Sequence, residues 1–348
     1  MMLATTVTRG TRDASKSRIA VIGTGGTFAM HARHPFDWVE YGESGIVHPI
    51  DALLETLGNL GDVSRDVEIV AIPFRTLGST GITPRDWVDL ATLIQSAAKQ
   101  DASLTGFVVT HGTATLEETA WFLELTLDVG VPVVLTGAQR PANTAGSDAV
   151  ANLRAALAVA KRPATVELGV VVVMDNYIFG AKDVSKGASF DLDAFEAVPY
   201  GPLGRVDADG SVKIHRTPLR NRISSSASLS FSGDLPRVDV VMSYAGADRV
   251  QIDACVAAGA KAIVSAGLPP GRPANAEFAG LEDAVKAGVV VVQSTRALRG
   301  VVPSQAFLRA KGILAGGDLS PQKARILLMV AMSRSMPRQA IQEWLLAA

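Results

Sequence analysis

Two short polar turns in the sequence carry hydroxyl side chains that could attack a carbonyl group. The turn "GTGGT" follows the apolar run "RIAVI" and ends at Thr27, and the turn "THGTAT" follows "GFVV" and contains Thr113. Two adjacent glycines let the backbone amides of the first turn approach a ligand closely. A hydroxyl nucleophile needs a partner that removes its proton, and a lysine whose pKa is lowered by burial can do so. Both threonines are therefore candidates for nucleophilic catalysis.

Several of these features have simpler interpretations. "GTGGT" is also typical of a tight turn before a loop, and it is no dinucleotide fingerprint because the third glycine and the following helix are missing. His111 lies nearer the strand and is more typical of a hydrogen-bonded structural residue than of a base. Cys255, the single cysteine, lies in an apolar-periodic segment and is expected to act as a small hydrophobe. Thr113 is the more informative candidate in the second turn.

The elements around the turns indicate an α/β architecture. Four short apolar runs are typical of strands, at 18–23, 106–112, 131–137 and 168–175. Such continuous runs favour a parallel sheet with helices on both faces. Doubly wound sheets bind ligands outside the carboxyl ends of their strands. Both turns follow strands directly, so they are expected where a ligand would bind.

Helix starts are marked soon after the strand ends. Thr83 is expected to cap a helix that begins with Pro84. Thr115 and Glu118 have the spacing of a capping box. Near the end of the chain, Ser320 is expected to cap the helix of "SPQKARILLMVAMSR".

The length of 348 residues favours two domains. A serine-rich stretch without helix or strand periodicity separates two strand-and-helix series. We predict a larger N-terminal α/β domain with a doubly wound, mainly parallel sheet, and a smaller C-terminal parallel α/β domain. The predicted boundaries are 1–213 for the catalytic domain, 214–234 for the linker and 235–348 for the C-terminal domain.

Charge and composition narrow the class of partner. The 33 basic and 34 acidic residues nearly balance, so the sequence carries no electrostatic footprint for nucleic acid or an anionic membrane. The first 20 residues lack the apolar run of a secretory signal, and no stretch approaches the length of a membrane span. We therefore expect a soluble cytoplasmic protein with a small-molecule partner.

Five segments, in this order and over nearly the whole chain, resemble the bacterial-type L-asparaginase and glutaminase family of amidohydrolases. They are "TGGT", "HGTATLEETAWFLELTL", "LTGAQRPANTAGSDAVANLRAAL", "DVSK" and "LSPQKARILL". The resemblance implies a homotetramer built from intimate dimers, in which the partner's smaller domain completes each site. It also implies that the enzyme needs no metal and no cofactor.

The resemblance assigns roles to particular residues. Thr27 matches the family's nucleophilic threonine, and Tyr41 matches a tyrosine on its mobile loop, here Met30 to Gly45. Thr113 and Lys186 match a proton-relay pair. Further positions match the family's substrate-binding residues: Gly26, Gly78, Ser79, Thr80, Gly112, Ala114, Ala138 and Gly246.

Some of these roles have alternatives. Ser79 matches the serine that holds the substrate's α-carboxylate, but it could be an ordinary turn residue. Tyr41 could be a packing residue of the loop, and Lys186 a solvated surface amine. The order in which Thr27 and Thr113 attack is not decided by the sequence.

The chain departs from the family where the substrate's α-ammonium is held. The family's "HGTDT" has an aspartate where this sequence has Ala114, and its asparagine matches Gly246. Its neighbouring acid falls in 299–314, which contains no Asp or Glu. Losing the partner of a desolvated charge costs about 3 to 5 kcal/mol, so asparagine should bind poorly. Arg299 is either a contact for an anionic or carbonyl group of the substrate or a surface arginine.

The sequence therefore predicts a threonine-dependent amidohydrolase for a small carboxamide that lacks a free α-amino group, or for a lactam. Two alternatives stay open. One is an ordinary asparaginase or glutaminase with replaced amino-group contacts. The other is a non-catalytic protein that binds small carboxylates.

Overall fold

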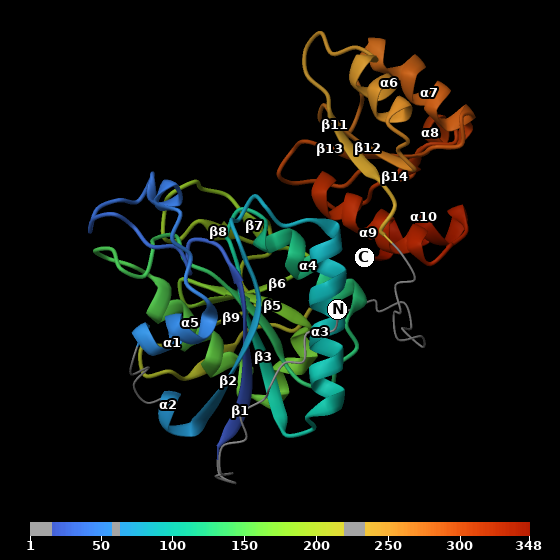
Figure 1. Ribbon diagram of the computed structural model, residues 1–348. Helices are drawn as coiled ribbons and strands as arrows, with labels where there is room; N and C mark the ends of the chain where they lie inside the picture. The colour runs from blue at the N-terminus through green and yellow to red at the C-terminus, as the bar shows by residue number, and fades with distance from the viewer. Residues whose placement is uncertain (1–15, 58–62, 219–233) are drawn as a thin grey trace.

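A computed structural model describes residues 16–57, 63–218 and 234–348. These residues form two α/β units, each with its own sheet (Figure 1). The predicted fold class, a larger mainly parallel sheet and a smaller parallel one, is confirmed. Most of the predicted linker, from 219 to 233, lies outside the described residues.

The larger sheet has eight strands in the order β10-β9-β6-β5-β4-β3-β1-β2. The strands from β2 to β5 are parallel, and β6, β9 and β10 are antiparallel additions at one edge. The chain adds β2 on one side of β1 and β3 on the other, so the order of strands switches at β1 and β3. Sheets of this class bind ligands at such a switch point. The strands are β1 (Ser17–Gly25), β2 (Val67–Leu77), β3 (Leu104–Thr110), β4 (Val133–Thr136), β5 (Val170–Met174), β6 (Tyr177–Gly180), β9 (Gly204–Val206) and β10 (Val212–Ile214).

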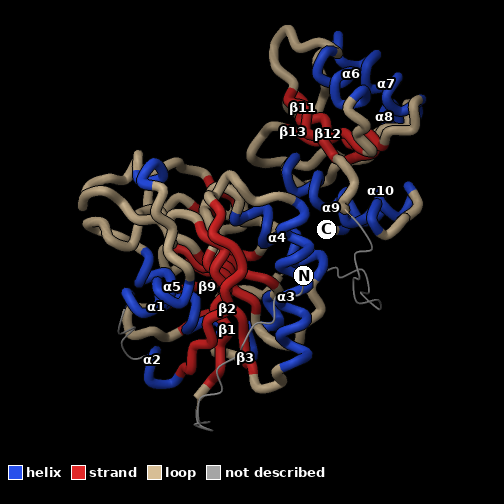
Figure 2. Tube along the Cα trace, viewed as in Figure 1, coloured by secondary structure: helices blue, strands red, loops and turns tan. Residues whose placement is uncertain are grey.

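Helices cover both faces of this sheet, as Figure 2 shows. Alternate residues of β1 enter different cores: Ile19 and Val21 face α1 (Ile50–Leu57) and α5 (Ala149–Ala160). Ala20 and Ile22 face α3 (Pro84–Gln100) and α4 (Leu116–Thr126). Burial on both faces explains why the strand is apolar throughout rather than alternating.

The smaller sheet has the order β11-β12-β13-β14, and all its pairs are parallel. Helices α6, α7 and α8 lie on one face, and α9 packs between the other face and α4 of the larger unit (Figure 1). The two units therefore share a continuous core through α9. The elements are β11 (Val238–Met242), α6 (Val250–Ala257), β12 (Ala262–Gly267), α7 (Phe278–Lys286), β13 (Val290–Thr295), α8 (Ala306–Ala310), β14 (Leu314–Ala315), α9 (Pro321–Ser333) and α10 (Arg338–Ala347).

Short elements complete the chain. The two-stranded sheet of β7 and β8 carries Lys186. These elements are η1 (Tyr41–Ser44), α2 (Val63–Asp66), η2 (Pro163–Leu168), β7 (Ser185–Lys186), β8 (Phe195–Glu196) and η3 (Asn275–Glu277).

Two of the three expected helix caps form. Thr83 and Asp86 make a full capping box at α3, and the Ser320 hydroxyl accepts from the Lys323 amide at α9. The capping box expected at α4 is wrong, because the Thr115 hydroxyl makes no cap and instead donates to the carbonyl of Ser79 at 2.8 Å. The Thr115 hydroxyl therefore bonds to a distant segment instead of capping its own helix.

Candidate active site

The carboxyl ends of β1 and β3 bring the two predicted turns into contact. The strands are neighbours, with Gly23 paired to Thr110. Gly26 has φ +72°, and a Cβ built on it would lie 2.3 Å from the Cα of Gly112. A Cβ on Gly112 would in turn lie 2.4 Å from the Cβ of Ser79. Only glycine permits this approach, so three separate segments converge at one point.

Thr27 pairs with Tyr41 at this point. The Thr27 side chain is 4% exposed, and its Oγ1 lies 2.7 Å from the Tyr41 Oη. Tyr41 begins η1 within the loop that the sequence singled out. Tyr41 is therefore joined to the first turn by a hydrogen bond rather than only packed within its loop.

The loop that carries Tyr41 is folded against the connection between β4 and α5. Asn143 donates to the Ala32 carbonyl at 2.8 Å and accepts from its amide at 2.9 Å. The Arg140 guanidinium lies 4.0 Å from the centre of the Trp38 ring. These contacts hold the loop against this connection.

Thr113 and Lys186 form a second contact. The Lys186 Nζ donates to the Thr113 Oγ1 at 2.8 Å and to the Gln139 Oε1 at 3.0 Å. Burial lowers the pKa of Lys186, and the negative charge of Asp148 partly opposes this. A half-buried amine with a lowered pKa can accept a proton, so Lys186 is no freely solvated amine.

Gln139 was missed by the sequence reasoning, which selected the neighbouring Ala138. Its Nε2 donates to the Asp191 carbonyl at 2.8 Å, and its backbone amide donates to the Asp148 carboxylate. Gln139 is therefore held so that its Oε1 faces the Lys186 amine. The only signal in the sequence was its place inside the segment "LTGAQRPANTAGSD".

His111 is a structural residue. It is 1% exposed, and its Nδ1 donates to the Gly112 carbonyl at 2.8 Å. Its Nε2 lies 2.9 Å from the Thr119 hydroxyl, which also accepts from the Trp87 indole. Burial lowers the pKa of His111 to about 4, so the imidazole stays neutral at physiological pH and supports the turn.

The remaining predicted positions divide between the two units. The Ser79 hydroxyl makes no hydrogen bond to any described residue, so it is free to meet a ligand. Ala114 is exposed beside this cluster, and Gly246 and Arg299 are exposed on the smaller unit. Gly78 and Thr80 flank Ser79, and Ala138 is fully buried.

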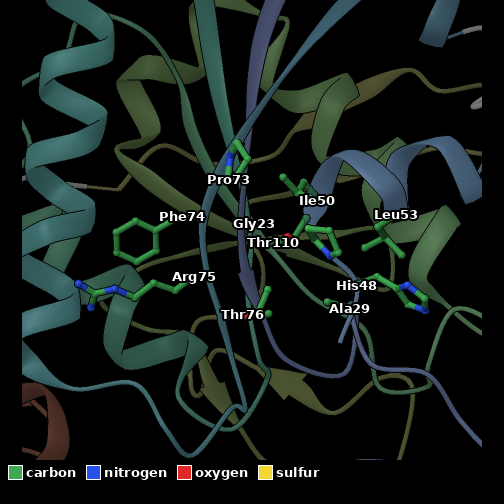
Figure 3. A pocket seen from close by; sticks show the side chains of 12 residues that line it. Gly23, Ala29, His48, Ile50, Leu53, Pro73, Phe74, Arg75, Thr76 and Thr110 are labelled. Carbon is green, nitrogen blue, oxygen red and sulfur yellow. The ribbon is translucent and has the colours of Figure 1, made fainter. Parts of the chain in front are cut away.

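A cavity of about 170 Å³ is lined in part by Gly23 and Gly25 of the first turn (Figure 3). It is lined by β1, β2 and α1, with His48, Ile50 and Phe74 among its walls. The side chains of Thr27, Tyr41, Thr113 and Lys186 are not part of its lining. The Thr27–Tyr41 and Thr113–Lys186 contacts thus lie outside this cavity, although Gly25 and Thr110 of the two turns line it.

Within the described ranges, no group of three or more His, Cys, Asp or Glu side chains is arranged to hold a metal ion. In the same residues, no helix has the length and apolar character needed to cross a membrane.

Models of known protein families match both units of the chain. The model of the family "Asparaginase, N-terminal" matches residues 18–220, and that of the "Glutaminase/Asparaginase C-terminal domain" matches 237–345. L-asparaginase 2 of Escherichia coli (strain K12) is 35% identical over 93% of this chain and 91% of its own. Glutaminase-asparaginase of Acinetobacter glutaminasificans is 32% identical over 94% of this chain and 98% of its own.

A solved structure is also similar. The crystal structure of a probable cytoplasmic L-asparaginase from Campylobacter jejuni has a TM-score of 0.86 and 32% identity, covering 95% of this chain and 99% of its own. Fold and sequence together define an amidohydrolase that acts on non-peptide C–N bonds. The chain belongs to the asparaginase family.

Proposed function

We propose that this protein hydrolyses a small carboxamide without a free α-amino group, or a lactam, through a threonine acyl-enzyme. The observation that carries the proposal is a contrast. The Thr27–Tyr41 and Thr113–Lys186 contacts are both complete, whereas position 114 presents only a methyl group. These two contacts support amide cleavage, and the alanine at position 114 supports a substrate without an ammonium group.

The proposed reaction proceeds in two steps. A threonine Oγ1 bonds to the amide carbonyl carbon, and its proton passes to a neighbouring base, the neutral Lys186 amine or the phenolate form of Tyr41. That proton then passes to the amide nitrogen as the C–N bond breaks, so a carboxamide releases ammonia and a lactam ring opens to an amine that stays on the acyl group. Water then adds to the ester and releases the acid, restoring the threonine. The backbone amide of Gly112 in the second turn is suited to stabilise the oxyanion, whereas the amide of Gly26 already donates to the Leu77 carbonyl at 2.7 Å. Neither threonine is assigned the first attack.

The amino end of the substrate determines the proposed specificity. Ala114 is exposed in the single chain, so water would partly screen a charge beside it. A hydrogen bond to a charged group contributes about 1.5 to 3 kcal/mol, or roughly ten- to a hundredfold in affinity. An amide without the α-ammonium loses nothing at this position.

The test compares asparagine with succinamate, which lacks only the amino group. We expect the wild-type protein to give a higher kcat/KM for succinamate, measured by ammonia release. Ala114→Asp should raise kcat/KM for asparagine by roughly ten- to a hundredfold, whereas the neutral control Ala114→Asn should not.

Each contrary outcome points to one alternative. A low-millimolar KM for asparagine, below that for succinamate, would establish an ordinary asparaginase or glutaminase. Binding of carboxylates without turnover of asparagine, N-acylated, succinamate-like or lactam substrates, and without an acyl adduct in mass spectrometry, would establish a binding protein.

We further propose a homotetramer built from intimate dimers, in which a partner's smaller unit completes each site. Large apolar side chains are exposed near Gly246 and Arg299: Met242 is 56% exposed, Leu298 84% and Val301 60%. Such residues mark protein contacts when they gather on one surface. Light scattering should give four chains for the wild type and fewer for Leu298→Asp; a fully active wild-type monomer would contradict the proposal.

We also propose a cytoplasmic location. The Campylobacter jejuni protein is described as probably cytoplasmic, although a relative from Haemophilus influenzae is described as periplasmic. Fractionation of cells that produce the full chain distinguishes the two locations.

A further inference from the structure

The backbone of Lys186 is held by a carboxylate that the proposed reaction does not use. The amide of Lys186 donates to the Glu117 Oε2 at 2.9 Å. Glu117 lies in the first turn of α4 and is 8% exposed. The same lysine uses its Nζ to contact Thr113. Glu117 therefore binds the backbone of Lys186, whose side chain contacts Thr113.

Glu117 is held in turn by helix α9. Its second oxygen, Oε1, accepts from the Gln322 Nε2 at 3.2 Å. Its backbone carbonyl accepts from the Lys323 Nζ at 2.8 Å. Both Gln322 and Lys323 lie in the first turn of α9, so the end of this helix is joined to Glu117 at two points.

Lys323 also holds the segment that leads to Lys186. Its Nζ donates to the Ala181 carbonyl at 2.6 Å, at the start of that segment. Lys323 is 2% exposed. Burial lowers its pKa to about 8, and the nearby carboxylates of Glu117, Glu118 and Asp183 act in the opposite direction and raise the pKa. A buried ammonium must be satisfied by hydrogen bonds, and these two carbonyls provide them. Lys323 thus fixes α4 and the approach to Lys186 relative to each other.

We propose that Glu117 is a positioning residue for Lys186. Through its hydrogen bonds it links helix α9 to the main chain of the proposed relay lysine. The proposal rests on the function proposed above for Lys186. It means that the smaller unit contributes to the active site of its own chain, by setting the distance between the Lys186 Nζ and the Thr113 Oγ1. A shift of about 1 Å at such a contact can lower the rate roughly a hundredfold.

The neighbouring Glu118 provides a matched control. It lies on the same turn of α4 and faces the same helix, where its Oε2 is 3.6 Å from the Arg325 Nη1. It makes no contact with Lys186 in the described structure. Removing Glu118 therefore weakens the contact between α4 and α9 and removes one of the charges around Lys323, but it removes no hydrogen bond of Lys186 or Lys323.

The experiment compares Glu117→Ala, Glu117→Gln and Glu118→Ala in the full chain. Hydrogen exchange at the Lys186 amide is measured by residue-resolved mass spectrometry, and kcat and KM are measured with the best amide substrate. For Glu117→Ala we expect amide exchange at least about tenfold faster and kcat about a hundredfold lower, with KM nearly unchanged. Glu117→Gln keeps an acceptor oxygen and should restore both, and Glu118→Ala should leave both close to wild type.

Contrary results are specific. Unchanged exchange and kcat in Glu117→Ala, or equal losses in Glu118→Ala, would overturn the positioning role. If Glu117→Ala does not fold, Gln322→Ala replaces it, because that change removes only the hydrogen bond from α9 to the Glu117 Oε1. Wild-type amide exchange and kcat in Gln322→Ala would also overturn the proposal. If the wild type cleaves no amide, the proposed function fails, but the exchange comparison still decides whether Glu117 holds Lys186.

Discussion

Replacing Thr27 with valine is expected to lower kcat for the best amide substrate by about 10⁴-fold or more. Valine keeps the branched shape of threonine and removes only the hydroxyl. The side chain is buried and its Oγ1 contacts only the Tyr41 phenol among the described residues. The variant therefore leaves the packing of the turn nearly unchanged while it removes one of the two hydroxyls proposed to form an acyl-enzyme.

Thr24→Val is the matched control for this prediction. Thr24 lies in the same turn and is equally buried, but its hydroxyl donates to the Thr110 carbonyl at 3.0 Å. Its loss should cost about 1 to 3 kcal/mol of stability and little activity in the protein that remains folded. Wild-type kcat in Thr27→Val, with correct folding shown by circular dichroism, would remove Thr27 from the mechanism.

Replacing Lys186 with methionine should lower kcat/KM by about 10³-fold, the size of a general-base contribution. Methionine fills the volume of the lysine stem but cannot accept a proton. The amine lies 2.8 Å from the Thr113 Oγ1, which is within the distance for direct proton transfer. Lys182→Met is the control, because the Lys182 Nζ instead contacts Asp318 and the Ala348 carbonyl.

The dependence of kcat/KM on pH provides a second test of Lys186. Lys186 can accept a proton only when it is neutral, so kcat/KM of the wild type should rise with pH as the amine loses its proton. Because burial lowers the pKa of Lys186, this rise should occur below the range of an ordinary lysine. The rise should be absent in Lys186→Met and kept in Lys182→Met. A rise that persists in Lys186→Met would assign the titration to another group.

Much of the fold was predictable because parallel strands buried on both faces must be apolar throughout. That pattern located β1, β3, β4 and β5, and it predicted that the smaller unit has a parallel sheet. It did not reveal β2, which lies at the sheet edge and is largely half-exposed. Nor did it reveal the antiparallel strands β6, β9 and β10, whose short runs carry too little periodicity.

The candidate site was predictable in part for a related reason. A turn that follows a parallel strand must lie at the carboxyl edge of the sheet, so Thr27 and Thr113 could be placed there from local sequence. Gln139 and Glu117 could not, because their roles depend on hydrogen bonds to Lys186 across 47 and 69 residues of chain. No local pattern records such a partner.

The sequence by itself determined which residue types are present: two threonines after strands, a lysine, and an alanine at the position that matches the family's aspartate. Tertiary structure alone decided their partners. The Thr115 hydroxyl has the spacing of a local cap, yet it donates to the Ser79 carbonyl from another segment. A side chain with hydrogen-bonding capacity takes the acceptor that the folded chain brings nearest, and that acceptor is set by the packing of the whole molecule.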